Sequence, residues 1–270
     1  MTRSPAAIAS FAAGFRLPFE AARMLLRERR LRGLASVPAL LSLLAVSAAF
    51  ACVIAYAGEL HGWATAWMPE LAAGRWYEWL WVAPAKLGLA AVGAALFLAF
   101  AGACLAIAYL LASLLASPFH DALAARVERL VTGAVRDDTE SGALGVFREG
   151  ARAMREEARR IAFFVAVVGS LAALGLLVPG AQLLTGPAIL AFTLFFLPLD
   201  YASYTLDRRR VSFREKRRWL GQHKPAVLGF GAAAFVTGLV PLVNLFAMPV
   251  LVVGGTLLAL RHPPRRVGGR

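Results

Sequence analysis

The sequence is poor in acidic residues and in charge of either sign. Of its 270 residues only 17% are charged, with 16 Asp and Glu against 29 Lys and Arg, while 59% are hydrophobic. The mean hydropathy of +0.65 is too high for a soluble domain of ordinary composition. The composition therefore excludes an ordinary soluble protein and predicts an integral membrane protein.

Cysteine and histidine are also scarce, and their positions do not suggest a metal site. The two cysteines, Cys52 and Cys104, lie inside apolar stretches, where a thiol usually packs as a small hydrophobic group. The four histidines are scattered through the chain without metal-ligand spacing. We therefore expect no metal, no cofactor and no enzyme activity.

The formal net charge of +13 has two explanations. In a soluble protein it would suggest a nucleic acid partner, but the chain has no motif in which basic and aromatic residues alternate. Basic residues also gather at the cytoplasmic surface of membrane proteins. We therefore expect the basic residues to face the lipid bilayer, and we expect no nucleic acid partner.

Long uncharged stretches indicate where the chain crosses the membrane. A transmembrane helix needs about 20 apolar residues, and residues 33–58 and 87–119 carry no charge at all. The pattern predicts an all-α protein with two long transmembrane helices, over residues 33–58 and 83–117. The linker between them, residues 59–82, is rich in tryptophan and has no basic excess, so we expect it on the periplasmic face.

The second predicted span is followed by residues typical of a helix start. Ser117 suits an N-cap, Pro118 suits the first helical position and Asp121 suits the first turn. They predict a break near Ser117 and cytoplasmic helices over residues 118–160. Ser117, His120 and Asp121 also suggest a catalytic triad, but residues of one helical turn are seldom arranged as nucleophile, base and orienting acid. We prefer the interpretation as a structural cap.

Two later uncharged stretches are each interrupted by turn signals. In residues 161–199 these are Pro179-Gly180 and Gly186-Pro187, and in residues 225–260 the signal lies at residues 238–241. Each stretch predicts a helical hairpin. The sequence leaves open whether the hairpins are re-entrant or span the bilayer.

Basic segments flank both predicted hairpins. Residues 200–224 separate the hairpins, and residues 261–270 form a basic tail. Because basic residues mark the cytoplasmic side, both hairpins are expected to begin and end there. The chain is thus predicted to be a single membrane domain, residues 1–270, with both termini cytoplasmic.

Residues 1–32 combine aromatic and basic residues. Phe11, Phe15 and Phe19 follow one another at intervals of four, and arginines accumulate just before the first span. The spacing predicts a helix that lies in the membrane interface. A helix packed on the protein's own surface explains the pattern equally well.

Local patterns in the basic connector give two further predictions. Ser212 followed by Glu215 is typical of a capping box. Asp200 and Asp207 lie close to several arginines, so we expect them to form ion pairs rather than to relay protons.

Three passages together are similar to the CysZ family of sulfate permeases, whose relatives include the eukaryotic etoposide-induced membrane proteins. The first, residues 116–128, is similar to the family pattern S/A-P-F-x-D-x-L-A-x-x-V-E. The second is Leu199-Asp200-Tyr201 followed by Arg210-Val211-Ser212-Phe213. The third has Pro241, Asn244 and Pro249 in an apolar run, followed by Gly255-Thr256.

The resemblance covers residues 15–260 and implies a fold and a function. It implies two long spans, two hairpins that dip into the bilayer, assembly as a homo-oligomer and transport of sulfate. The family's basic Gly-Leu-Arg-Arg stretch, which is the expected sulfate contact, is replaced here by Arg30-Leu31-Arg32-Gly33. Only Leu31 and Arg32 match that pattern in place.

The residues themselves suggest two candidate sites. Arg30 and Arg32, with Gly33, could hold an oxyanion, because guanidinium groups and helix N-termini both bind such anions; a topological role for the same arginines is the alternative. Asn244, with Pro241 and Thr256, could line a pore. Alternatively, the Asn244 amide pairs with backbone groups freed by Pro241.

These observations favour an inner-membrane permease or channel for sulfate or a related oxyanion, supplying sulfur assimilation in a bacterium. The alternative is a non-transporting membrane scaffold or lipid-interacting protein of the same fold, which the shifted arginine motif and the short hairpin arms would also fit.

Overall fold

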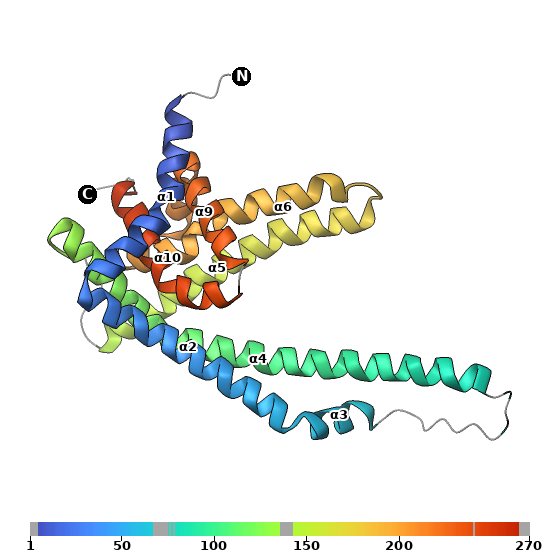
Figure 1. Ribbon diagram of the computed structural model, residues 1–270. Coiled ribbons are helices and arrows are strands. Elements are labelled where there is room, and N and C mark those ends of the chain that lie inside the picture. Colours follow the sequence, from blue (N-terminus) through green and yellow to red (C-terminus); the bar gives the residue numbers. More distant parts are fainter. Residues whose placement is uncertain are drawn as a thin grey trace. The chain divides into compact units, whose positions relative to one another are not determined.

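The computed structural model describes residues 5–66, 75, 77, 79–135, 143–239 and 241–264 (Figure 1). In these parts of the chain every regular element is a helix. Four helical segments are long and apolar enough to cross a bilayer: Arg29–Ala55, Leu80–Thr132, Met154–Leu177 and Gln182–Arg208. The prediction of an all-α integral membrane protein is confirmed.

The described residues form two compact units, which we treat separately. The smaller unit is Leu40–Ser117, and the larger one combines Met1–Ala39 with Pro118–Arg270. How the predicted segments are distributed between cytoplasm, lipid and periplasm stays a prediction.

The smaller unit holds most of the first predicted span and all of the second. Helix α2 (Arg29–Ala55) covers the first span up to Ala55, short of its predicted end at residue 58, and the short α3 (Ala57–Thr65) follows. Helix α4 (Trp79–Thr132) contains the second span. The ring of Trp63 on α3 meets that of Phe100 on α4 edge to face, with 4.5 Å between centroids. Much of the predicted periplasmic loop, including residues 67–74, lies outside the described residues.

Helix α4 does not break where the sequence predicted. It continues through Ser117, Pro118 and Asp121 to Thr132, and Gly133 then ends it with a positive φ of 78°. The predicted cap is therefore wrong, because none of the three residues begins a helix. Burial is the reason: side chains after the proline, including Leu123, are fully buried in the larger unit, and their packing outweighs the missing proline N–H.

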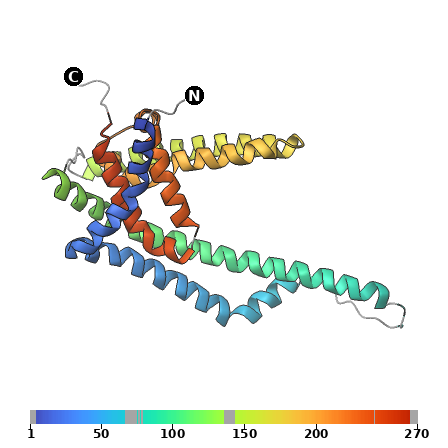
Figure 2. The ribbon, with the colours of Figure 1, turned by 45° about the horizontal axis from the view of Figure 1, so that its top comes forward.

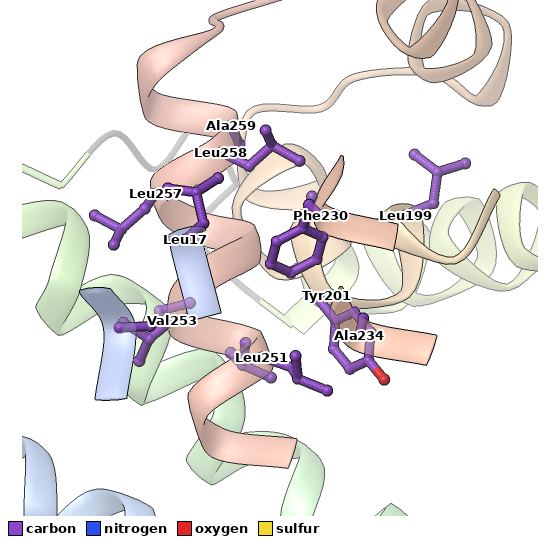
Figure 3. Close-up of a cluster of buried hydrophobic side chains, with 14 of the residues drawn as sticks. Leu17, Leu199, Tyr201, Phe230, Ala234, Leu251, Val253, Leu257, Leu258 and Ala259 are labelled. Atoms are coloured by element: carbon purple, nitrogen blue, oxygen red, sulfur yellow. The ribbon is translucent and has the colours of Figure 1, made fainter. Parts of the chain in front are cut away.

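The larger unit is built on close helix contacts. Helix α1 (Pro5–Arg27) packs against α9 (Lys224–Gly238) and α10 (Pro241–Arg261) (Figure 1). A Cβ atom on Gly14 would lie 2.0 Å from the carbonyl oxygen of Ala226, so only glycine permits this approach. Buried residues from all three helices meet in one core, with Leu17, Phe230 and Leu251 among them (Figure 3).

The packing of α1 bears on its two interpretations. One face, with Leu17, is buried against the protein itself, as the second interpretation proposed. The face with Phe11, Phe15 and Phe19 remains exposed. The helix thus packs on the protein and still presents an apolar row to its surroundings.

Helices α5 (Ala143–Leu177) and α6 (Gln182–Phe196) lie side by side, in Figure 1 and again in Figure 2. The turn between them contains Gly180 with φ of 82°, as Pro179-Gly180 predicted. The predicted turn at Gly186-Pro187 is wrong, because Pro187 lies inside α6. Helix α6 therefore begins at Gln182, before the second predicted turn, and the chain continues into α7 (Pro198–Arg208).

Two local predictions are confirmed in the following segment. Helix α8 (Phe213–Gln222) begins at Ser212, whose hydroxyl accepts from the Glu215 backbone N–H while the Glu215 carboxylate accepts from the Ser212 backbone. Helix α9 ends at Gly238 and α10 begins at Pro241, in agreement with the predicted interruption at residues 238–241.

Candidate functional site

The predicted anion-binding residues lie in the first turns of α2. Arg30, Arg32 and Gly33 are all exposed, while Leu31 between them is fully buried. Neither arginine has a hydrogen bond or an ion pair with any described residue, so both guanidinium groups are open to a ligand. A Cβ atom on Gly33 would meet nothing within 4 Å, which leaves room beside them.

The start of α2 does not offer an open helix N-terminus. The Arg32 backbone N–H donates to the carbonyl of Glu28 at 3.1 Å, and the Glu28 N–H donates to Met24 at 3.1 Å. The helical path thus carries on from α1 into α2. An anion here would be held by side chains.

The predicted pore residues lie on α10. Pro241 and Asn244 are in its first turns, and their side chains lie outside the described residues. Thr256 is fully buried, and its hydroxyl accepts a hydrogen bond from the equally buried Thr205 of α7 at 3.2 Å. Thr256 therefore contributes to the packing of α10 on α7.

Of the former cap residues, Asp121 meets a charged partner. Nη1 of Arg208, on α7, donates to the Asp121 backbone oxygen at 3.0 Å and lies 3.4 Å from Oδ1 of its carboxylate. The part of α4 that follows Pro118 is thereby tied to α7.

Sequence reasoning missed a buried ion cluster at Glu128, about two helical turns after Asp121 on α4. Glu128 is only 1% exposed, and Oε1 accepts from Nε of Arg209 at 3.2 Å, with a second, shorter contact from Nη2. Nη2 of Arg208 lies 3.6 Å from the other carboxylate oxygen, Oε2. Arg208 itself is 8% exposed. One buried carboxylate thus faces two guanidinium groups.

This cluster is incompletely satisfied by described residues. Nε and Nη2 of Arg208 and Oε2 of Glu128 are buried without a hydrogen-bond partner among them. His120, on the same helix, is also buried, and its Nδ1 has no hydrogen-bond partner among the described residues. The centroid of its ring lies 5.8 Å from that of the Tyr204 ring. Buried polar atoms of this kind are usually paired with protein or with ordered water.

The acids of α7 are paired, as expected from the sequence. Asp200 lies 3.0 Å from Nη1 of Arg160, and Asp207 lies 2.6 Å from Nζ of Lys216. The partner of Asp207 is a lysine rather than an arginine.

One signal in the sequence could have identified the buried cluster. Asp121 and Glu128 are seven residues apart, which places them on one face of a helix, and both belong to an amphipathic stretch. The run Arg208-Arg209-Arg210 reads in the sequence as a marker of the cytoplasmic side, because the sequence alone does not show that these arginines contact α4.

The comparisons with known proteins agree with the resemblance described above. The model of the family "Sulfate transporter CysZ/Etoposide-induced protein 2.4" matches residues 17–249. The chain belongs to this family. The matched range includes Arg30, Arg32, Glu128 and Asn244, and it ends before Thr256.

Relatives of the CysZ family with curated names give the same result. The chain is similar to the sulfate transporter CysZ of Pseudomonas aeruginosa, with 31% identity over 158 residues, or 58% of this chain and 63% of the relative. The sulfate transporter CysZ of Salmonella typhimurium is 33% identical over 149 residues, or 55% of this chain and 58% of the relative. The chain thus covers less than two thirds of these relatives. Their names are those of transporters and not of enzymes.

Proposed function

We propose that this protein is a permease or channel for sulfate or a related oxyanion in a bacterial inner membrane, supplying sulfur assimilation. The observation that carries the proposal is the pair of exposed arginines, Arg30 and Arg32, in a chain whose family is named for a sulfate transporter. The curated relatives in Pseudomonas and Salmonella are named sulfate transporters, which supports the choice of anion.

The charge of the two arginines suits such a ligand. Sulfate carries two negative charges, and a guanidinium can donate two parallel hydrogen bonds to its oxygens. Two arginines therefore balance the charge of one dianion. The excess of basic residues over the whole chain, a net charge of +13, would further raise the local concentration of anions.

The route across the bilayer is assigned to the second hairpin. Pro241 and Asn244, at the start of α10, are the proposed pore residues, with Thr256 further along the same helix. Irregular backbone at membrane depth is tolerated where it is buried in protein or lines water, so the segment between α9 and α10 is a reasonable place for a polar path. Assembly as a homo-oligomer, with both termini cytoplasmic, completes the proposal.

Uptake of radiolabelled sulfate into proteoliposomes tests this function. Vesicles that contain the purified protein are compared with protein-free vesicles of the same lipid, over a range of sulfate gradients. Faster uptake with protein, reduced by an excess of unlabelled sulfate, is the expected result. Equal uptake in the two preparations would reject the permease.

A non-transporting, lipid-interacting scaffold is the second candidate. The exposed phenylalanine row of α1 favours it, because the row provides a surface for lipid without any path for an ion. Incorporation of folded protein that changes vesicle size or lipid packing but leaves sulfate uptake unchanged would select this function over the first.

A further inference from the structure

An apolar groove opens between α1, α9 and α10 within the larger unit. Its volume is about 640 Å³, inside the range of about 300–1,000 Å³ that is usual for ligand sites. All three helices contribute to the lining, which includes Phe15, Phe19, Ala22, Ala233, Val236 and Val250. Phe19 and Val236 are each 59% exposed, so the groove communicates with the surroundings of the protein.

The chemistry of the groove is that of a site for hydrocarbon. The lining has one hydroxyl, that of Thr237, and this hydroxyl already donates to the Ala233 carbonyl at 2.8 Å. The lining side chains therefore offer no free hydrogen-bonding group to a polar ligand. An unbranched or slightly bent apolar chain is the kind of ligand that such a lining accepts.

A row of exposed side chains leads from the groove to positive charge. Phe11, Phe15 and Phe19 follow each other along α1, with ring centroids 6.5 Å and 6.1 Å apart. Continuing by the same interval of four residues gives Arg23 and then Arg27, and side chains at this spacing are neighbours on a helix surface. Both arginines are exposed and have no partner among the described residues.

The nearest acid on α1 does not cancel this charge. Glu20, one residue beyond Phe19, forms an ion pair of 2.5 Å with Arg261 at the end of α10. That pair also fixes α10 to α1 beside the groove. The row therefore combines a hydrocarbon site at one end with two available cations at the other.

We propose that the groove binds one anionic phospholipid, with an acyl chain between α1, α9 and α10 and the phosphate at Arg23 and Arg27. The positive end of the row matches a lipid that carries net negative charge and gives no advantage to a zwitterionic one. A second copy of the chain is a poorer occupant, because a two-fold contact would use the same patch on both subunits. That patch would bring the same two arginines, and its acid, Glu20, is already paired with Arg261, so a second copy gives Arg23 and Arg27 no free counter-charge.

Competitive lipid retention tests this site independently of transport. Full-length protein is purified in mild detergent, incubated with equal amounts of phosphatidylglycerol and phosphatidylcholine, and examined by native mass spectrometry. We expect one tightly held phosphatidylglycerol per chain. The double variant Arg23→Gln, Arg27→Gln should lower the preference for phosphatidylglycerol by about tenfold or more, since each arginine near an anionic lipid contributes separately.

Two further variants distinguish the groove from general surface charge. Arg218→Gln removes an exposed arginine of α8 as a matched control and should leave retention unchanged. Ala22→Trp fills the groove and should lose the bound lipid, while circular dichroism confirms that helix content is retained. Equal retention of the two lipids by the unmodified protein would overturn the proposal. So would a groove occupied by a second chain, seen as a lipid-free dimer that Ala22→Trp dissociates.

Discussion

Glu128 of α4 accepts a hydrogen bond from Arg209, which lies 81 residues later in the chain, just past the end of α7. The contact joins two segments that are unrelated in sequence, inside the larger unit. The Glu128 carboxylate is buried, and a second guanidinium, that of Arg208, lies close by. Glu128 therefore supplies negative charge to two guanidinium groups near the core.

Removing this carboxylate should be costly. Glu128→Gln removes the buried carboxylate that Arg208 and Arg209 share, and it leaves Arg208 with the half-exposed Asp121 as counter-charge. Breaking a buried pair in this way typically costs about 3–5 kcal/mol. We expect the free energy of unfolding in detergent to fall by about that amount. Glu157→Gln is the matched control, because it removes a half-exposed partner of Arg160 and should cost less than about 1 kcal/mol. Similar losses for both variants would contradict a special role for Glu128.

The crossing of α1 and α9 should not accept a methyl group. Gly14→Ala would place Cβ 2.0 Å from the Ala226 carbonyl oxygen, so the helices must separate, at a cost of about 1–3 kcal/mol or more. Gly88→Ala on α4 has nothing within 4 Å of the new atom and serves as the control. Because alanine is favoured over glycine within a helix by about 0.5–1 kcal/mol, the control should be neutral or stabilising. Thermal unfolding followed by circular dichroism measures both.

The end of α10 should be sensitive to acid. Burial, and then the neighbouring His223 and Arg261, lower the pKa of His262 below its ordinary value, and its carbonyl oxygen accepts from Nε1 of Trp219. In the unfolded chain His262 binds its proton at a higher pH than in the folded protein. The free energy of unfolding should therefore keep the full contribution of neutral His262 above about pH 6.5 and decrease as the pH falls below that value.

Replacing this imidazole separates its contribution from that of other groups. His262→Asn keeps the backbone carbonyl for Trp219 and removes the titrating ring, so melting temperatures measured between about pH 5 and pH 8 should vary less than in the parent protein. An unchanged pH profile would show that His262 is not the responsible group.

The predicted topology places α8 and the end of the chain on one side of the membrane. With Cys52 and Cys104 replaced by serine, single cysteines introduced by Arg218→Cys and Pro263→Cys should react with an impermeant thiol reagent only from the cytoplasmic side. Labelling of the two positions from opposite sides would show that the second hairpin crosses the bilayer an odd number of times.

Local chemistry explains which sequence predictions succeeded. The capping box at Ser212 and Glu215 depends on residues three apart, and the turn at Gly180 depends on a positive φ that glycine adopts freely. The turn signal at Gly186-Pro187 and the helix-start signal at Pro118 failed, because a helix continues through each proline. After Pro118, buried side chains such as Leu123 maintain the helical path by packing, and no local rule contains that information.

The candidate site shows the same limit. Arg30 and Arg32 could be selected from sequence because arginines just before an apolar span are visible in the chain and have a recognisable chemistry. The pairing of Glu128 with Arg209 could not, because it depends on how α4 meets α7. Asp121, selected as a cap, proved to be a partner of Arg208 through the same tertiary contact.

The dependence of sulfate uptake on Arg30 and Arg32 tests the account most directly. Initial rates in proteoliposomes are compared for the parent protein, the double variant Arg30→Ala, Arg32→Ala, and the conservative double variant with lysine. Arg218→Ala, which removes an exposed arginine of α8, is the control for loss of positive charge elsewhere in the chain. The account predicts that the alanine pair loses at least about 90% of uptake, since removal of charged hydrogen bonds to a dianion costs well over about 1.4 kcal/mol. It also predicts that the lysine pair restores part of the uptake and that Arg218→Ala retains it. Full uptake by the alanine pair, in a preparation where the parent protein transports sulfate, would contradict the assignment of these arginines as the anion site.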